Sequence, residues 1–446
     1  MDDPAWLVPV ALVLALCLVL GGGAVAGYFA DVVLQVVSIP LLLAGLWRLR
    51  TDDPTQRSAL LFCGGLVLVP LFQLIPLPPG LWTLLPWRGV SVTSLDLAGQ
   101  DLGWRPMTVS PHATWLVLVS LIPPLAVFIA VLQLSHSDRR VLVLVVLALG
   151  IVASFVGLLQ VALGPSGGVV DFGPTSPGEA TGFFANRNHF AALLYVLLLF
   201  SSVWAIESTS SLQVGPTDKV DPAAFVRIVV CFTVVVVFLG AELMARSRAG
   251  LGLTIVALLG IAALASSTAQ TTQGQQVRAS RLIGAAVGLV VLFGAQFALY
   301  RAMERFATDP LGDARLVFAR RTWDAAVAFL PFGSGLGTFV PVYQAFEKPP
   351  DALLDTYANR AHNDVLEVVL ETGVAGVLLM VLFAVWLIRN LWRVWGTKEK
   401  LKGSDGLLAR AASFALVLLA AHSLVDYPLR TTALMAITAL ACALLI

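Results

Sequence analysis

Long apolar segments alternate with short polar connections along the whole chain. A helix needs about 20 mostly apolar residues to cross a bilayer, and twelve runs approach or reach that length. The predicted spans are 6–28, 31–47, 58–76, 113–134, 141–163, 189–206, 225–243, 250–267, 282–299, 366–388, 411–427 and 430–446. The first run lacks a basic leader and a clear cleavage site, so we interpret it as a retained span rather than a signal peptide. The pattern predicts an all-α polytopic membrane protein.

The composition supports this interpretation. Of the 446 residues, 58% are hydrophobic and 12% are charged, against about 25% charged in an ordinary soluble domain. A lipid bilayer is therefore the expected environment, and a net charge of +1 gives no electrostatic case for nucleic acid or a strongly acidic partner. The four cysteines all lie inside apolar runs, which excludes a zinc motif and favours small core side chains over disulfides. They are Cys17, Cys63, Cys231 and Cys442.

Lysine and arginine in the short connections predict how the helices are oriented. With the N-terminus in the cytoplasm, the connections on that side carry 15 basic residues, and the short connections on the other side carry six. Both termini are therefore expected in the cytoplasm. The predicted organisation is helices one to nine in 1–299, a large outer loop in 300–365 and helices ten to twelve in 366–446.

A second outer segment, residues 77–112, is rich in proline and tryptophan. Aromatic side chains are common at headgroup depth. Trp82, Trp87 and Trp104 are therefore expected to act as interfacial anchors, with a sugar-stacking platform as the alternative.

His362 is a histidine for which the sequence offers a chemical role. Asp364 and Glu367 have the spacing of a capping box, which predicts a helix that begins at Asp364, with His362 in the loop before it. The alternative, a helix already running through His362, would turn it about 160° away from Asp364, Glu367 and Glu371. Either geometry makes these acids poor orienters of the imidazole. A lone histidine is usually structural, but its position at the outer membrane face, after an arginine-rich loop, strengthens the case for catalysis.

Two groups of arginines lie on the outer side. Guanidinium groups are rigid forks suited to phosphate oxygens, although a solvated amphipathic helix is the ordinary explanation for most of the loop arginines. Arg246 and Arg248 lie in a tight connection, against the topology rule, and charge costs about 2.5–3.5 kcal/mol at a helix centre and less at its end. We therefore expect something anionic to bind there. The loop arginines are Arg301, Arg305, Arg315, Arg320, Arg321 and Arg360.

Asn186, Arg187 and Asn188 open the sixth span. Two amides and an arginine can hydrogen-bond sugar hydroxyls or phosphate, but asparagine is also a routine helix cap, so both roles stay open. His422 and Asp426 are four residues apart and are expected on one helix face near the outer end of the eleventh span. A carboxylate can fix the tautomer of an imidazole. The pair is therefore a candidate proton relay, with a buried structural pair as the more ordinary alternative.

The glycine-rich segment Gly333–Phe339 invites interpretation as a nucleotide-binding loop. It has neither the spacing of a dinucleotide-binding fold nor the Gly-Lys-Ser/Thr of a P-loop, and no strand precedes it. We therefore predict a tight turn.

In combination, these motifs resemble the O-antigen ligase and polymerase superfamily, membrane glycosyltransferases of the GT-C class. The most specific element is His362-Asn363, followed after nine residues by Gly373-Val374-Ala375-Gly376. The resemblance covers roughly residues 70–430 and implies a dozen spans, with one large periplasmic loop that ends at the histidine. The other elements, in the family's order, are Gln73–Pro79, Asn186–Asn188, Ser247–Gly250, Arg315-Leu316, Gly333–Phe339, and His422 with Asp426.

The resemblance implies transfer of a glycan from an undecaprenyl-diphosphate carrier to a sugar hydroxyl, at the periplasmic face of the bacterial inner membrane. His362 then matches the catalytic histidine, and Arg248 and Arg315 match the diphosphate-binding arginines. Arg321 is the reserve, because the loop register is not fixed, and Arg246 stands beside Arg248. The residues assigned to glycan or phosphate contact are Asn186, Arg187, Asn188 and Asn363.

The chemistry agrees with this assignment. Displacing a diphosphate needs charge stabilisation that guanidinium groups supply without a metal, and an imidazole is a suitable base for the incoming hydroxyl. No Asp-x-Asp cluster is evident at this face, so we expect an inverting transfer with no metal and no cofactor.

Several functions need the same residues. A ligase transfers the glycan to lipid A core, a polymerase joins two carrier-linked glycans, and a protein O-oligosaccharyltransferase modifies a polypeptide. The first two are favoured, since no extra periplasmic domain is evident. A transporter or flippase of polyprenol-linked glycans is the alternative from a different class, but transporters place polar residues near the midplane and carry internal repeats.

Overall fold

The computed structural model describes most of the chain. The described residues are 4–23, 27–49, 53–164, 178–210, 222–268, 310–352, 357–396 and 404–446. The predicted span 282–299 and the loop residues Arg301 and Arg305 lie outside them.

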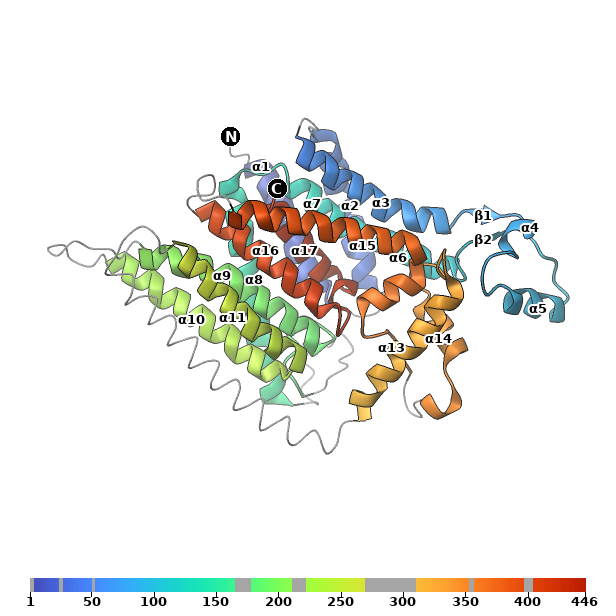
Figure 1. The fold of residues 1–446 in the computed structure, drawn as a ribbon. Helices are drawn as coiled ribbons and strands as arrows, with labels where there is room; N and C mark the ends of the chain where they lie inside the picture. The colour runs from blue at the N-terminus through green and yellow to red at the C-terminus, as the bar shows by residue number, and fades with distance from the viewer. Residues whose placement is uncertain are drawn as a thin grey trace.

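Helices make up nearly all of the regular structure (Figure 1). The α-helices are α1 Pro4–Leu20, α2 Phe29–Arg48, α3 Pro54–Gln73, α4 Pro79–Trp82, α5 Gly89–Leu97, α6 Pro111–Ser120, α7 Ile122–Val131, α8 His136–Leu163, α9 Arg187–Ser210, α10 Pro222–Ala245, α11 Arg248–Thr268, α13 Pro310–Phe329, α14 Phe339–Phe346, α15 Asp364–Gly396, α16 Ser404–His422 and α17 Thr432–Leu444. The described residues also contain two 3₁₀ turns, η2 Pro349–Asp351 and η3 Pro428–Arg430, and two short strands, β1 Pro76–Leu77 and β2 Arg105–Pro106.

The prediction of an all-α polytopic membrane protein is confirmed. Among the described residues, nine helical segments are long and apolar enough to cross a membrane, with α6 and α7 together forming one of them. Two shorter apolar helices, Ala5–Leu20 and Thr432–Leu444, match the first and last predicted spans. All four cysteines are free thiols, as expected. The total of twelve spans stays a prediction.

Two of the predicted spans differ from the helices observed. The segment predicted at 113–134 is divided at Leu121, because Pro123 and Pro124 have no amide hydrogen to continue the helical bonds of α6. The segment predicted at 411–427 ends at His422. Asp426 therefore lies in the turn after α16 and not on its helical face.

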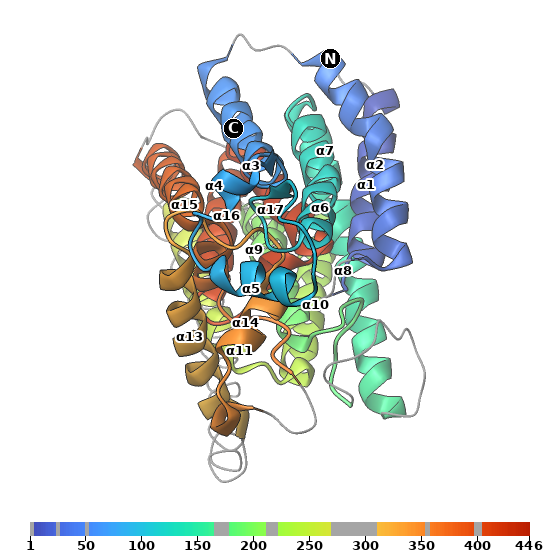
Figure 2. The ribbon, with the colours of Figure 1, turned by 90° about the vertical axis from the view of Figure 1, so that its right-hand side faces the viewer.

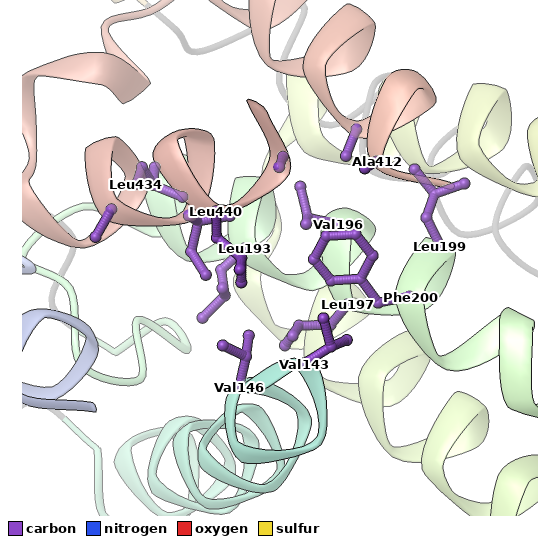
Figure 3. Packing of buried hydrophobic residues seen from close by; sticks show 14 of the residues in the cluster. Val143, Val146, Leu193, Val196, Leu197, Leu199, Phe200, Ala412, Leu434 and Leu440 are labelled. Atoms are coloured by element: carbon purple, nitrogen blue, oxygen red, sulfur yellow. The ribbon is translucent and has the colours of Figure 1, made fainter. Parts of the chain in front are cut away.

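The buried centre of the bundle is α9. Its residues 190–200 are at most 2% exposed, and α8, α10, α11 and α16 all pack against it. Figure 3 shows Val196 and Phe200 of α9 among apolar side chains from neighbouring helices, including Ala412 of α16. An apolar helix can face either lipid or a protein core, and here the neighbouring helices cover α9 on its sides. The start of α9, which carries Asn186–Asn188, is thereby held in a fixed place.

Both chain ends lie at one end of the bundle. Trp6 of α1 donates its indole hydrogen to the carbonyl of Ala130 near the end of α7, at 3.2 Å. Arg139 at the start of α8 donates to the carbonyl of Ala443 near the end of α17, at 2.8 Å. Figure 2 shows both termini towards the top and α13 and α14 in the lower half. The loop that precedes His362 is therefore remote from the termini.

A small outer hairpin occupies residues 76–107, where β1 pairs antiparallel with β2. Trp82 is buried beneath it and donates its indole hydrogen to the carbonyl of Gly103 at 3.0 Å. The prediction that Trp82 is an interfacial anchor, or part of an exposed stacking platform, is therefore wrong. Trp87 stacks on Phe329 of α13, with ring centroids 6.0 Å apart, which joins this hairpin to the large loop.

The glycine-rich segment Gly333–Phe339 is a turn, as predicted, and it braces a kink in α15. Gly373 has a left-handed backbone (φ +57°), so the carbonyls of Leu370 and Glu371 are free to accept the amides of Ser334 (3.0 Å) and Gly335 (2.9 Å). This contact fixes the first two turns of α15 against α13 and α14.

Replacing Gly373 by alanine is expected to destabilise the fold. A Cβ there would lie 2.1 Å from the carbonyl oxygen of Pro331, and a left-handed non-glycine residue alone costs about 1–3 kcal/mol. The check is the midpoint of thermal unfolding in detergent, which should fall for Gly373→Ala. The control is Gly64→Ala on α3, where an added Cβ meets nothing within 4 Å. Equal midpoints for the two variants would contradict this account of the kink.

Candidate functional site

The predicted site residues gather at the end of the bundle opposite to the chain termini. His362 lies just before α15, Asp426 in the turn after α16, Asn188 in the first turn of α9 and Ser247 just before α11. The segments of His362 and Asn188, which are far apart in sequence, both meet the carboxylate of Asp426.

The central contact joins His362 to Asp426. The imidazole Nδ1 lies 2.9 Å from Asp426 Oδ1. The His362 side chain is 22% exposed and the Asp426 side chain is fully buried. His362 has a left-handed backbone (φ +49°), a conformation that is rare without glycine and clusters at functional sites. The site thus pairs a partly exposed imidazole with a fully buried carboxylate.

Two aromatic rings hold the imidazole plane. Phe318 of α13 stacks on it with ring centroids 6.1 Å apart, and Tyr427 meets it edge-on at 5.1 Å. Because these rings and Asp426 surround His362, its orientation is set by two separate segments, α13 and the turn after α16. Sequence reasoning passed over Tyr427, although it directly follows Asp426.

The carboxyl of Asp426 is held ionised by its neighbours. Burial alone would raise the pKa of Asp426. The hydrogen bond from His362 and the nearby imidazoles of His189 and His422 have the larger, opposite effect, so the pKa lies well below the ordinary value. Tyr427 shows the opposite effect, since burial and the charge of Asp426 raise its pKa to about 12. The aspartate is therefore an acceptor and the tyrosine a neutral hydroxyl near neutral pH.

The side chains of His422 and Asp426, predicted to form a relay, bond to other residues instead. The side-chain bonds of Asp426 go to His362 and Asn188, while His422 Nδ1 lies 3.1 Å from the hydroxyl of Tyr195 on α9. The two predicted members contact through the backbone, where the Asp426 amide donates to the His422 carbonyl at 2.9 Å. His422 is thus a buried neighbour of the pair rather than its partner.

His189 is a third histidine at the site. It is fully buried, and its ring meets Tyr427 edge-on at 4.8 Å. Neither ring nitrogen has a hydrogen-bond partner among the described residues. The sequence signal was its position directly after Asn188.

The three residues that open α9 have separate roles in the structure. Asn186 caps the helix, since its Oδ1 accepts the amide of Asn188 at 2.8 Å. Arg187 forms an ion pair with Glu179. Asn188 donates its amide hydrogen to Asp426 Oδ2 at 2.6 Å. Of the three, Asn188 is the one that joins the His362–Asp426 pair.

Arg246 and Arg248, at the start of α11, lie on either side of a buried serine in the sequence. Ser247 is 3% exposed and caps α11, because its hydroxyl accepts the amide of Gly250 at 3.0 Å. Arg246 has a left-handed backbone (φ +53°), and Arg248 is exposed at the first position of α11. This tight turn presents two guanidinium groups beside the capped helix start.

The structure distinguishes the two loop arginines that sequence reasoning left open. Arg315 lies one helical turn before Phe318, which stacks on His362, so the two share a face of α13. Arg321 lies further along and its guanidinium is held by Asp351 at 2.6 Å and by Asp324 at 3.3 Å. The hydrogen bond to Asp351 raises the pKa of Arg321. Arg321 is likewise three residues from Phe318, so what sets the two arginines apart is that two acids already engage Arg321.

The acids at the start of α15 do not orient His362, as predicted. Asp364, Glu367 and Glu371 surround Arg430, with N–O distances of 3.3, 3.4 and 3.0 Å. Burial alone would lower the pKa of Arg430. The three carboxylates together have the larger, opposite effect, so the pKa lies above its ordinary value. The acids nearest to His362 in sequence are thus engaged by an arginine from the turn after α16.

The helix begins at Asp364, as predicted, but the predicted capping box is wrong. The cap is Asn363, whose Oδ1 accepts the amide of Leu366 at 3.0 Å. Glu367 reaches back to the amide of Ala361 at 3.0 Å and not to Asp364, because the Asp364 amide is already bonded to the carbonyl of Ser423. Asn363 also donates to the carbonyl of Leu424 at 2.8 Å, so its amide is used in holding the loop.

Residues 223–381 match the family model described as O-antigen ligase. This segment belongs to the O-antigen ligase family. A search of the curated proteins found no match.

The O-antigen ligase segment contains only part of the site. His362 and the four arginines at 246, 248, 315 and 321 lie within it. Asp426 and Asn188 lie outside it, in flanking helices and turns. The residues that hold the histidine in place therefore come from both the matched segment and its surroundings.

Removing the Arg430 charge is expected to destabilise the fold. Arg430→Met would leave three buried carboxylates with Arg360 as their remaining cation, and breaking a buried ion pair costs about 3–5 kcal/mol. The check is the free energy of unfolding in a mixed-detergent titration. Arg320→Met removes an exposed arginine of α13 and serves as control. An Arg430→Met protein as stable as this control would contradict the structural role.

Proposed function

We propose that the chain is a membrane glycosyltransferase that moves a glycan from an undecaprenyl-diphosphate carrier to a sugar hydroxyl. The O-antigen ligase match supports an enzyme of this general type with lipid-linked glycans as substrates. The observation that carries the proposal is the His362–Asp426 pair at the end of the bundle remote from the termini. With both termini in the cytoplasm, that end faces the periplasm of a bacterial inner membrane.

His362 acts as the general base. A carboxylate only accepts hydrogen bonds, so the ring hydrogen is assigned to Nδ1, where it faces Asp426, and the lone pair is left on Nε2. Nε2 then takes the proton of the acceptor hydroxyl, a step typically worth about 10² to 10⁴-fold in rate. The ionised Asp426 stabilises the imidazolium that forms, as carboxylates do in related acid–base arrangements.

The acceptor oxygen attacks the anomeric carbon from the side opposite to the diphosphate. The new carbon–oxygen bond forms as the bond to the diphosphate oxygen breaks, so the configuration inverts and the leaving group departs with the bonding electrons. Arg248, Arg246 and Arg315 stabilise the charge that develops on this diphosphate. We propose that this electrostatic role requires no metal and no cofactor.

The acceptor is lipid A core or a second carrier-linked glycan. Both present a sugar hydroxyl in a lipid-anchored chain, which suits a base at the membrane surface. A protein O-oligosaccharyltransferase or a flippase would share the arginines. A flippase has no use for a general base, so turnover of the donor separates that alternative from the proposal.

Replacing His362 by alanine is expected to lower glycan transfer by at least about 10²-fold, because the base is lost. Asp426→Asn should also lower the rate, because the carboxylate no longer fixes the tautomer. The assay incubates purified protein with a defined undecaprenyl-diphosphate glycan and each candidate acceptor, with and without EDTA, and products are identified by mass spectrometry.

His112→Ala is the matched control, since His112 is exposed at the start of α6. Full activity in His362→Ala would remove the histidine from the mechanism. Loss of activity in EDTA that magnesium restores would overturn the metal-independent step.

The two loop arginines should behave differently. Arg315→Gln is expected to lower the transfer rate by about 10-fold or more, because one guanidinium on the leaving group is lost. Arg321→Gln should change it little, because Asp351 and Asp324 already engage that side chain. Initial rates over a range of donor concentration measure both effects, and the reverse order would transfer the role to Arg321.

A further inference from the structure

Asn188 bridges two parts of the site through both ends of its side-chain amide. Its Nδ2 donates to Asp426 Oδ2 at 2.6 Å, and its Oδ1 accepts the hydroxyl hydrogen of Ser247 at 2.8 Å. The amide orientation follows from the partners, since the carboxylate can only accept. Together with the 2.9 Å contact between Asp426 and His362, these bonds form a continuous chain from Ser247 to the imidazole.

Ser247 is fixed at both of its hydrogen-bonding functions. It donates to Asn188 and accepts the amide of Gly250, which leaves it little freedom to rotate. The two residues beside it in sequence, Arg246 and Arg248, carry the guanidinium groups of the turn. The hydrogen-bonded chain therefore begins between the two arginines and ends at the histidine.

The close approach of α11 to α9 is a second, independent observation. A Cβ at Gly250 would lie 2.4 Å from the Cβ of Ala191 and 3.0 Å from the Ser247 hydroxyl. The start of α11 is thus packed directly on the first turn of α9, at the level of Asn188. Asn188 and Ser247 are themselves 8% and 3% exposed, so water has little access to the bond between them.

We propose that Asn188, held by Ser247, is a positioning residue that fixes the Asp426 carboxylate against His362 and keeps the arginine turn in register with it. The inference rests on the proposed function, in which His362 is the base. It replaces the sugar- or phosphate-contacting role expected for Asn188, because both ends of its amide are already bonded within the protein.

The amide hydrogen of Asn188 draws part of the negative charge of Asp426 away from the imidazole. Without it, the carboxylate would favour the imidazolium form more strongly, and the neutral base would be present only at higher pH. The other charged or titratable groups around the pair include His189 on α9, His422 on α16, Arg315 on α13, Asp364 on α15, Arg360 and Tyr427. Glu242 of α10 lies beside Ser247, at the other end of the hydrogen-bonded chain.

The test measures the reactivity of His362 directly. Diethyl pyrocarbonate modifies neutral imidazole, and His362 is partly exposed whereas His189 and His422 are buried. The full-length protein in detergent is treated over a range of pH, and modification of the peptide that contains His362 is followed by mass spectrometry. In Asn188→Leu, the pH midpoint should rise by about half to one unit, since one hydrogen bond to a charged group is lost.

Ser247→Ala should move the midpoint in the same direction by a smaller amount, and it also serves if Asn188→Leu fails to fold. The matched control is Asn390→Leu, which removes a buried amide that donates to the Trp386 carbonyl of its own helix. Its midpoint should equal that of the natural protein. An unchanged midpoint in folded Asn188→Leu or folded Ser247→Ala would overturn the inference.

Transfer activity separates this inference from the proposed function. The acid limb of the rate against pH should shift upward in Asn188→Leu together with the modification midpoint. Suppose that His362→Ala abolishes transfer, but in Asn188→Leu neither the pH midpoint of His362 modification nor the acid limb of the transfer rate moves. Then only the positioning role of Asn188 fails. If His362→Ala keeps full activity while the modification midpoint still shifts, the proposed function fails and the hydrogen-bonded chain stands.

Discussion

A buried carboxylate is the constraint on which the site depends. Asp426 has no exposed surface, and an ionised carboxylate out of water is costly unless its oxygens are hydrogen-bonded. His362 serves one oxygen and Asn188 the other. Since these partners precede α15 and open α9, satisfying one charge ties three distant segments together at the same end of the bundle.

The fold could be predicted from local sequence to the extent that membrane spans are local. The length of the apolar runs in the sequence was enough to find every candidate spanning helix that the structure describes, because a bilayer requires about 20 apolar residues in one stretch. It could not show that α9 is central. Lipid and a protein core are equally apolar, so the more apolar α8 is less buried than α9. Helix ends were less predictable, as at His422, where the chain turns to bring Asp426 to His362.

The site was predictable as a set of motifs but not as a set of contacts. His362, Asn188 and Asp426 were each singled out from the sequence, yet the expected pairing joined Asp426 to His422. A spacing of four predicts a shared face only while the helix continues, and α16 ends at His422. Tyr427 and Arg430 were passed over because their roles depend on the turn that follows. Long-range contacts of this kind leave no periodic signal.

The acidic side chains near His362 fall into two groups with different partners, which explains why the site needs residues beyond the O-antigen ligase segment. Within that segment, the carboxylates next to His362 are Asp364, Glu367 and Glu371, and all three are engaged by Arg430 from outside it. The carboxylate that meets the imidazole, Asp426, also comes from outside. The turn after α16 therefore does two things at once. Its Arg430 engages the three acids at the start of α15, and its Asp426 is the carboxylate that bonds to the imidazole of His362.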